Sequence, residues 1–86
     1  MNLEEELFTI TGEECAELIM AMSKISRFGL DKKNKANLKQ ELGDVACMLT
    51  LFVEHGYITE KELIRCADKK KNKLTIWSGL IPDEYK

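Results

Sequence analysis

Hydrophobic residues recur at helical spacing through the first third of the chain. Between about Leu3 and Arg27 they recur at intervals that keep them on one side of a helix, the pattern of an amphipathic helix; they are Leu3, Leu7, Ile10, Leu18, Ala21 and Ile25. Gly29 follows as a C-terminal cap. Gly12 weakens the pattern, so the helix could instead begin at Thr11, with Glu14 completing a capping box.

Two further helices are predicted downstream. The polar, lysine-rich stretch Asp31–Asn37 is expected to be a loop, and Asn37 to cap a second helix that runs to about His55. Its stripe is Leu38, Leu42, Val45, Leu49 and Phe52, and Gly56 ends it. Thr59, with Glu62 in a capping box, begins a third helix that ends near Leu74. The tail WSGLIPDEYK is expected to be irregular.

These elements predict an all-α fold. We expect a compact helical bundle of two long antiparallel helices plus a third. With 86 residues, the chain is expected to form a single domain over residues 1–86, and its small core favours completion by oligomerisation.

Charge and cysteine content exclude some classes of protein. The formal net charge is −2, unlike that of a basic nucleic-acid-binding domain. Three dispersed cysteines, with no CxxC pair, fit a reducing cytoplasm better than a disulfide framework. No apolar run is long enough to span a membrane, and no signal peptide is visible. We therefore expect a cytoplasmic protein with neither nucleic acid nor membrane as partner.

Acidic residues intrude on the apolar stripes of the first two helices. Successive helix residues are about 100° apart, which places Glu14 within the first stripe, Glu17 at its edge and Glu13 toward solvent. On the second helix, Glu41 lies inside the stripe and Asp44 at its edge.

Buried carboxylates are costly unless they are paired or bind a metal. No Lys or Arg shares these stripe positions, and four hard oxygen ligands suit Mg²⁺ or Mn²⁺. The only histidine, His55, lies at the far end of its helix. The alternative is that both acidic pairs are ordinary solvated helix faces, but two such pairs on adjacent stripes favour a metal site.

The two acidic motifs, EECAE (Glu13 to Glu17) and ELGD (Glu41 to Asp44), resemble those of the MazG-like all-α nucleoside triphosphate pyrophosphohydrolases. The resemblance extends from about Leu3 to Asn72. It implies Mg²⁺-dependent hydrolysis of a nucleoside triphosphate to a monophosphate and pyrophosphate, with a role in cleaning the nucleotide pool.

The resemblance also implies roles for the acidic residues. Glu14, Glu17, Glu41 and Asp44 would be the metal ligands and catalytic residues. Either Glu14 or Glu17 could help to deprotonate the attacking water. Glu13 would orient a lysine or a water beside the site.

On the third helix, the run DKKKNK provides candidates for binding the substrate. Lys69, Asn72 and Lys73 would hold the pyrophosphate that leaves. A solvated helix end, where lysines favour the dipole, is an equally good interpretation of this run. Family resemblance further implies a homodimer or homotetramer.

Two other functions stay open. A non-catalytic helical interaction module would use the apolar stripes for dimerisation and would bind no Mg²⁺. A related hydrolase would keep the fold but cleave the phosphoanhydride of a nucleoside diphosphate or a phosphoribosyl-nucleotide.

Overall fold

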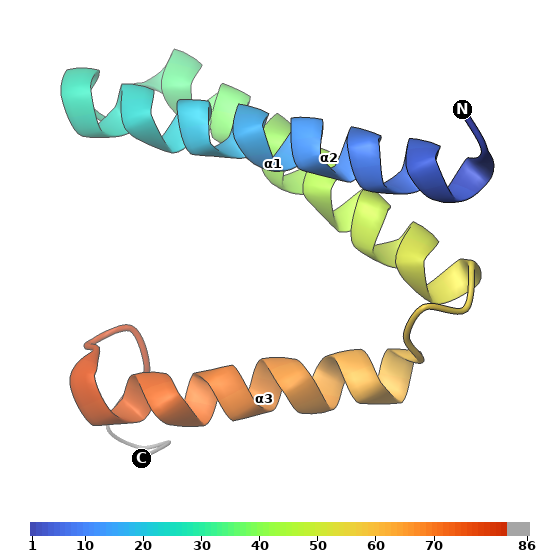
Figure 1. Cartoon of the computed structure of the whole chain (residues 1–86). Helices are drawn as coiled ribbons and strands as arrows, with labels where there is room; N and C mark the ends of the chain where they lie inside the picture. Colours follow the sequence, from blue (N-terminus) through green and yellow to red (C-terminus); the bar gives the residue numbers. More distant parts are fainter. Residues whose placement is uncertain (83–86) are drawn as a thin grey trace. The chain divides into compact units, whose positions relative to one another are not determined.

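The computed structural model describes residues 1–82, and within them it contains three α-helices and no strand (Figure 1). Helix α1 spans Leu3–Phe28, α2 spans Lys32–Glu54 and α3 spans Glu60–Trp77. The predicted all-α fold is therefore confirmed. The chain divides after His55 into two units, a hairpin of α1 and α2 and a second unit that contains α3. The packing of the third helix on the other two stays a prediction.

Helix α1 is continuous, so the alternative start at Thr11 is wrong. The Asn2 side chain caps the helix by accepting a hydrogen bond from the Glu5 backbone N–H at 2.8 Å. Thr11 lies inside α1, where its hydroxyl donates to the Leu7 carbonyl at 2.7 Å. At the other end Gly29 takes a φ of 94°, and its N–H bonds to the Ile25 carbonyl, as expected of a glycine cap.

Helix α2 begins well before the predicted cap at Asn37, so the prediction of a loop over Asp31–Asn37 is wrong. Asp31 is the cap, and its carboxylate accepts from the Asn34 N–H at 2.7 Å. The Asn34 amide in turn donates to the Gly29 carbonyl at 3.0 Å and ties the helix start to the end of α1. Lysine is a good helix former, and the lysine-rich stretch here forms the solvated first turns of the helix. Gly56, with a φ of 82°, follows the end of α2 as predicted.

The two helices of the first unit pack side by side and antiparallel (Figure 1). Leu7 and Ala21 of α1 and Met48 of α2 are its buried apolar residues. The rings of Phe8 and Phe52 meet at a centroid distance of 5.6 Å across the pair. The hairpin buries few side chains for its length, and this leaves large apolar groups in contact with solvent.

Helix α3 begins with the predicted capping box. The Glu62 N–H donates to the Thr59 hydroxyl at 3.1 Å, and the Thr59 N–H donates to the Glu62 carboxylate at 3.0 Å. The helix continues past the predicted end at Leu74 to Trp77, over whose ring the Lys70 ammonium lies at 5.9 Å. The last four residues of the predicted irregular tail lie outside the described residues.

None of the helices within residues 1–82 has both the length and the apolar character that crossing a membrane requires.

Candidate metal centre

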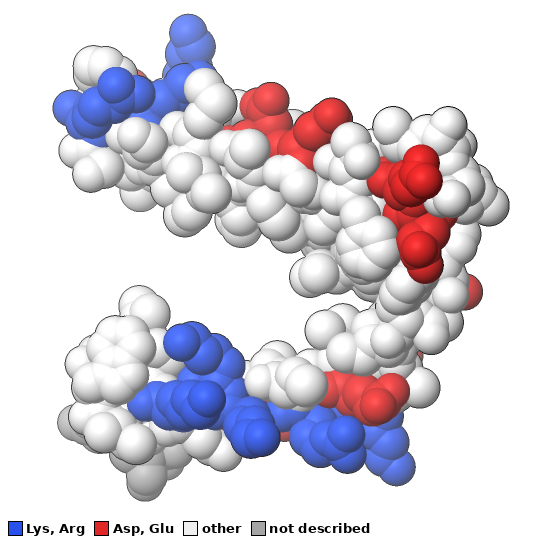
Figure 2. Space-filling view, in the orientation of Figure 1, with Lys and Arg blue, Asp and Glu red and all other residues white. Residues whose placement is uncertain are grey.

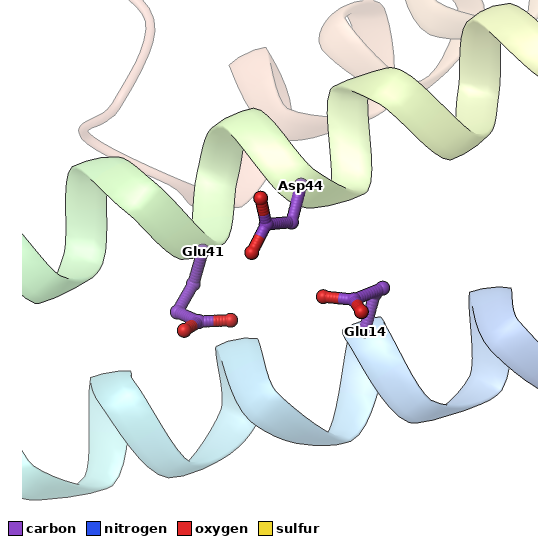
Figure 3. A group of neighbouring side chains, drawn as sticks. All are labelled: Glu14, Glu41 and Asp44. Atoms are coloured by element: carbon purple, nitrogen blue, oxygen red, sulfur yellow. The ribbon is translucent and has the colours of Figure 1, made fainter.

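Three acidic side chains meet between the two helices of the hairpin. Glu14 projects from α1 toward α2, and Glu41 and Asp44 project from successive turns of α2 toward α1 (Figure 3). One carboxylate oxygen from each lies within 4.8 Å of the others. Antiparallel pairing puts the middle of α1 level with the middle of α2, which is why two motifs far apart in sequence converge.

One oxygen of this cluster is buried and lacks a partner. Oε2 of Glu41 is shielded from solvent and has no hydrogen-bond partner among the described residues. Leaving a buried carboxylate oxygen unsatisfied is costly, whereas a bound cation would satisfy it. All three residues are half-buried and offer hard oxygen ligands, the donor set that Mg²⁺ and Mn²⁺ prefer. The residues present therefore fit a divalent metal ion.

The neighbouring carboxylates disfavour the ionised form of Glu14. The pKa of Glu14 is raised above 4.5, first by partial burial and then by the negative charges of Asp44, Glu41, Glu17 and Glu13, in that order. Partial desolvation and like charges both penalise the ionised form. A divalent cation between the helices would reverse this penalty, because it would supply the opposite charge at the point where the carboxylates meet.

Asp44 is held by a neighbour, Gln40, that the sequence analysis did not place at the site. The Gln40 side-chain amide donates to Oδ1 of Asp44 at 2.9 Å, one helical turn away. The four-residue spacing of a glutamine and an aspartate on one helix could have indicated this bond. It fixes one Asp44 oxygen and so orients the carboxylate toward the cluster.

Glu17 and Glu13 lie at the edge of the site. Both are exposed, and the three-carboxylate group that the described residues form does not include either of them. Three positions along α1 turn Glu17 about 60° away from Glu14. Its charge still contributes to the raised pKa of Glu14, ahead of that of Glu13. The role of Glu17 as a ligand therefore stays a prediction.

The candidate substrate-binding residues share one face of α3. Lys69, Asn72 and Lys73 are exposed and follow Arg65 at intervals of a helical turn. Arg65, Lys69 and Asn72 together line one hollow of the surface. Figure 2 shows basic side chains gathered along α3. The sequence analysis did not include Arg65, which the same four-residue spacing before Lys69 could have indicated.

Comparison with known proteins identifies the family. The model of the MazG nucleotide pyrophosphohydrolase domain matches residues 3–74, which include both acidic motifs and nearly all of α3. No curated protein and no solved structure gives a significant match. Because the match extends over most of the chain, the protein belongs to the MazG nucleotide pyrophosphohydrolase family.

Proposed function

We propose that this protein is a Mg²⁺-dependent nucleoside triphosphate pyrophosphohydrolase. It would convert an NTP or dNTP and water to the monophosphate and pyrophosphate, and so clean the nucleotide pool. The observation that best supports this is the carboxylate cluster with the unsatisfied, buried Glu41 oxygen, in a chain of this family.

The metal would be held by four carboxylates. Glu14, Glu41 and Asp44 already converge, and Glu17 would join them with a change of side-chain rotamer. Mg²⁺, for which Mn²⁺ could substitute, would neutralise phosphoryl oxygens and lower the pKa of water bound to it. Without this positive charge, the acidic cluster would repel a polyanionic substrate.

The proton of the attacking water needs an acceptor near the cluster. A carboxylate oxygen of Glu14 or Glu17 that does not bind the metal would take this role; Glu17 is exposed, and its charge acts on Glu14 of the cluster. A carboxylate within hydrogen-bond reach of the water can act as general base. Glu13, on the solvent side, would orient the water or a substrate group through a hydrogen bond.

The leaving pyrophosphate would be held by α3. Lys69 and Lys73 supply ammonium groups and Asn72 an amide donor on one helix face. Charge-assisted hydrogen bonds to phosphate oxygens are among the stronger polar contacts in proteins.

We further propose that the enzyme works in the cytoplasm and that it is a homodimer or homotetramer. The oligomer is proposed because the hairpin leaves many large apolar side chains exposed.

Product analysis in isotopically labelled water tests the reaction. The purified protein would be incubated with a panel of NTPs and dNTPs in H₂¹⁸O, with Mg²⁺ or with EDTA. We expect monophosphate and pyrophosphate only with Mg²⁺, and ¹⁸O only in the monophosphate, since water attacks the α-phosphorus. Label in the pyrophosphate would mean attack at the β-phosphorus and would contradict the mechanism.

Matched variants connect the activity to the cluster. Glu41→Gln and Asp44→Asn should each abolish turnover, whereas Glu60→Gln, which removes the same charge from the first turn of α3, should retain it. Intact triphosphates at micromolar enzyme would overturn the proposal. Turnover of nucleoside diphosphates or phosphoribosyl-nucleotides instead would keep the metal site but change the substrate.

A further inference from the structure

Two acids of the candidate metal centre turn to the same side of the hairpin. Glu17 follows Glu14 by three positions, and Asp44 follows Glu41 by three positions. Three positions along a helix turn the second residue about 60° away from the first. Because α1 and α2 are antiparallel, this rotation takes Glu17 and Asp44 to one common side. We call it the acid side of the hairpin.

All lysines and arginines of the hairpin lie close to the turn between its two helices. Within residues 1–55 they are confined to positions 24–39, and Asp31 is the only acid in that range. They are Lys24, Arg27, Lys32, Lys33, Lys35 and Lys39. Figure 2 shows basic side chains gathered at one end of the hairpin and acidic ones farther along it. The electrostatic potential therefore becomes more positive from the carboxylate cluster toward the turn.

Two of these cations turn to the acid side. Lys24 follows Glu17 by two helical turns and Lys33 precedes Asp44 by three, so each lies within about 20° of the acid on its own helix. The neighbouring lysines of α2 are turned from Lys33 by about 100° or more. Arg27 is turned from Lys24 by about 60°, in the direction away from α2. Lys24 and Lys33 thus share a side of the hairpin with the metal centre.

Lys24 and Lys33 also lie level with each other. Lys24 is ten positions closer to the turn than Glu14, and Lys33 is eight to eleven positions closer to it than Glu41 and Asp44. The axes of packed helices are about 8–10 Å apart, so two flexible lysine side chains on one side can reach a common anion. Within residues 1–82 neither lysine forms an ion pair. An anion between them would neutralise both charges.

A polar stripe on α2 connects this lysine pair with the cluster. Lys33, Asn37, Gln40 and Asp44 follow one another at intervals of four, three and four residues, which keeps them on one side of the helix. Asn37 carries an amide that can donate to phosphate oxygens, and Gln40 donates to Asp44. No apolar residue belongs to the stripe. The acid side of α2 is therefore suited to a polyanionic chain that extends from the metal centre toward the turn.

The distance along the hairpin indicates which phosphate the lysine pair would meet. Ten residues of helix correspond to about 15 Å. The four-carbon stem of an extended lysine covers about 6 Å of this distance, and a charge-assisted hydrogen bond covers about 3 Å. The remainder is about 6 Å, the length of two phosphate units. This is the separation between an α-phosphate at the metal centre and the γ-phosphate of the same nucleotide.

We propose that Lys24 and Lys33 bind the γ-phosphate of the substrate and make the site selective for nucleoside triphosphates over diphosphates. The α-phosphate lies at the carboxylate cluster, and the phosphate chain extends along the polar stripe toward the turn. This inference rests on the proposed function and names the groups that recognise its substrate. It involves the hairpin alone and does not depend on the lysines of α3.

Binding of uncleavable nucleotides tests the proposal. In the α,β-methylene analogues of the dNTPs and dNDPs, carbon replaces the bridging oxygen at the cleavage point, and the two series differ only in the γ-phosphate. Titration calorimetry with Mg²⁺ would compare the wild type with Lys24→Ala/Lys33→Ala. The wild type should bind the triphosphate analogue at least about tenfold more tightly than the diphosphate analogue. The double variant should lose this preference and bind the diphosphate analogue like the wild type.

Lys35→Ala/Lys39→Ala is the matched control. It removes two positive charges from the same end of the hairpin, but from other sides of α2, and it should retain the preference for the triphosphate analogue. All four lysines are exposed, so both double variants should keep the melting temperature of the wild type within a few degrees. An equal loss of preference in both variants would indicate a general attraction by the basic end and would overturn the proposal. A wild type that binds both analogues equally would also overturn it.

Failure of this proposal is distinguishable from failure of the proposed activity. If the wild type releases pyrophosphate from dNTPs but the lysine pair does not affect the preference, only the role of Lys24 and Lys33 is lost. If the preference depends on both lysines in a protein that cleaves no nucleotide, the phosphate site is supported and the activity is overturned.

Discussion

Glu14 of α1 and Asp44 of α2 face each other across the hairpin, with carboxylate oxygens within 4.8 Å. Neither is fully buried, yet Asp44 is the neighbouring charge that most raises the pKa of Glu14. In the metal-free protein this pair is a local destabilising feature. In the metal-bound protein the same two charges would instead be stabilising, because they would bind the cation.

Glu14→Gln should raise the melting temperature of the metal-free protein at pH 7 by a few degrees, because it removes a charge from the cluster. The same change should abolish the further rise that Mg²⁺ gives to the wild type. Thermal unfolding with EDTA and with Mg²⁺ measures both effects. Glu13→Gln removes the same charge on the solvent side and should show a much smaller rise and an intact Mg²⁺ response. A Glu14→Gln protein that Mg²⁺ still stabilises like the wild type would exclude Glu14 as a ligand.

The raised pKa of Glu14 also gives the metal-free protein a pH dependence of a definite sign. Over the window that begins near 4.5 and ends at the raised pKa, the folded protein holds more protons than the unfolded one. This contribution to stability is therefore present at low pH and is lost as pH rises through that window. Melting temperatures in EDTA, wild type against Glu14→Gln, isolate it. The difference in melting temperature between the two proteins should widen as pH rises above 4.5. A constant difference would contradict the raised pKa of Glu14.

The sequence predicted the helices better than their ends. Apolar spacing identified three helices, and local cap chemistry located the start of α3 at Thr59. The start of α2 was missed because Asp31 and Asn37 are both good caps. The choice between these two caps depended on the hydrogen bond from the Asn34 side chain to the Gly29 carbonyl. The spacing of residues along the sequence does not reveal this contact between two segments.

The site was predictable to the same extent. The helical positions of Glu14, Glu41 and Asp44 relative to their apolar stripes were enough to expect them to converge. Glu17 is the exception. It lies at the edge of its stripe, where the side-chain rotamer decides whether the carboxylate points toward the cluster. The role of Gln40 at the site was not predicted, because Gln40 was assigned to the expected cap at Asn37 and only the 2.9 Å bond to Asp44 connects it with the cluster.

Gln40→Met should weaken Mg²⁺ binding by about 10- to 100-fold, because residues that orient metal ligands commonly contribute that much. The change removes the amide that fixes Oδ1 of Asp44 but leaves all four carboxylates. Titration calorimetry with Mg²⁺ measures the affinity. Thr50→Val, which removes the hydrogen bond from the Thr50 hydroxyl to the Ala46 carbonyl elsewhere on α2, serves as the control. Equal affinities for Gln40→Met and wild type would show that the bond does not position Asp44.

Lys69→Ala should lower kcat/KM by about 10- to 100-fold, the loss expected for one charge-assisted hydrogen bond to phosphate. Lys71→Ala is the matched control, since it removes the same charge from the opposite side of α3. Lys69→Arg should recover part of the activity. Equal effects of Lys69→Ala and Lys71→Ala would show that these lysines attract the substrate only through their general positive charge. That result is the one expected of a solvated helix end.

Asp31→Ala should reduce the free energy of unfolding by about 1 kcal/mol, because it removes the cap of α2. Asn37→Ala should instead leave stability unchanged or raise it by about 0.5 kcal/mol, since Asn37 is a helix-interior residue and alanine is the better helix former. The two changes thus separate the observed helix start from the one that the sequence favoured. Urea unfolding monitored by circular dichroism measures both, and Asp31→Asn, which keeps a capping oxygen, should stay within about 0.5 kcal/mol of wild type. A larger loss of stability for Asn37→Ala than for Asp31→Ala would mean that the helix starts at Asn37. Lys32, Lys33 and Lys35 would then belong to a loop.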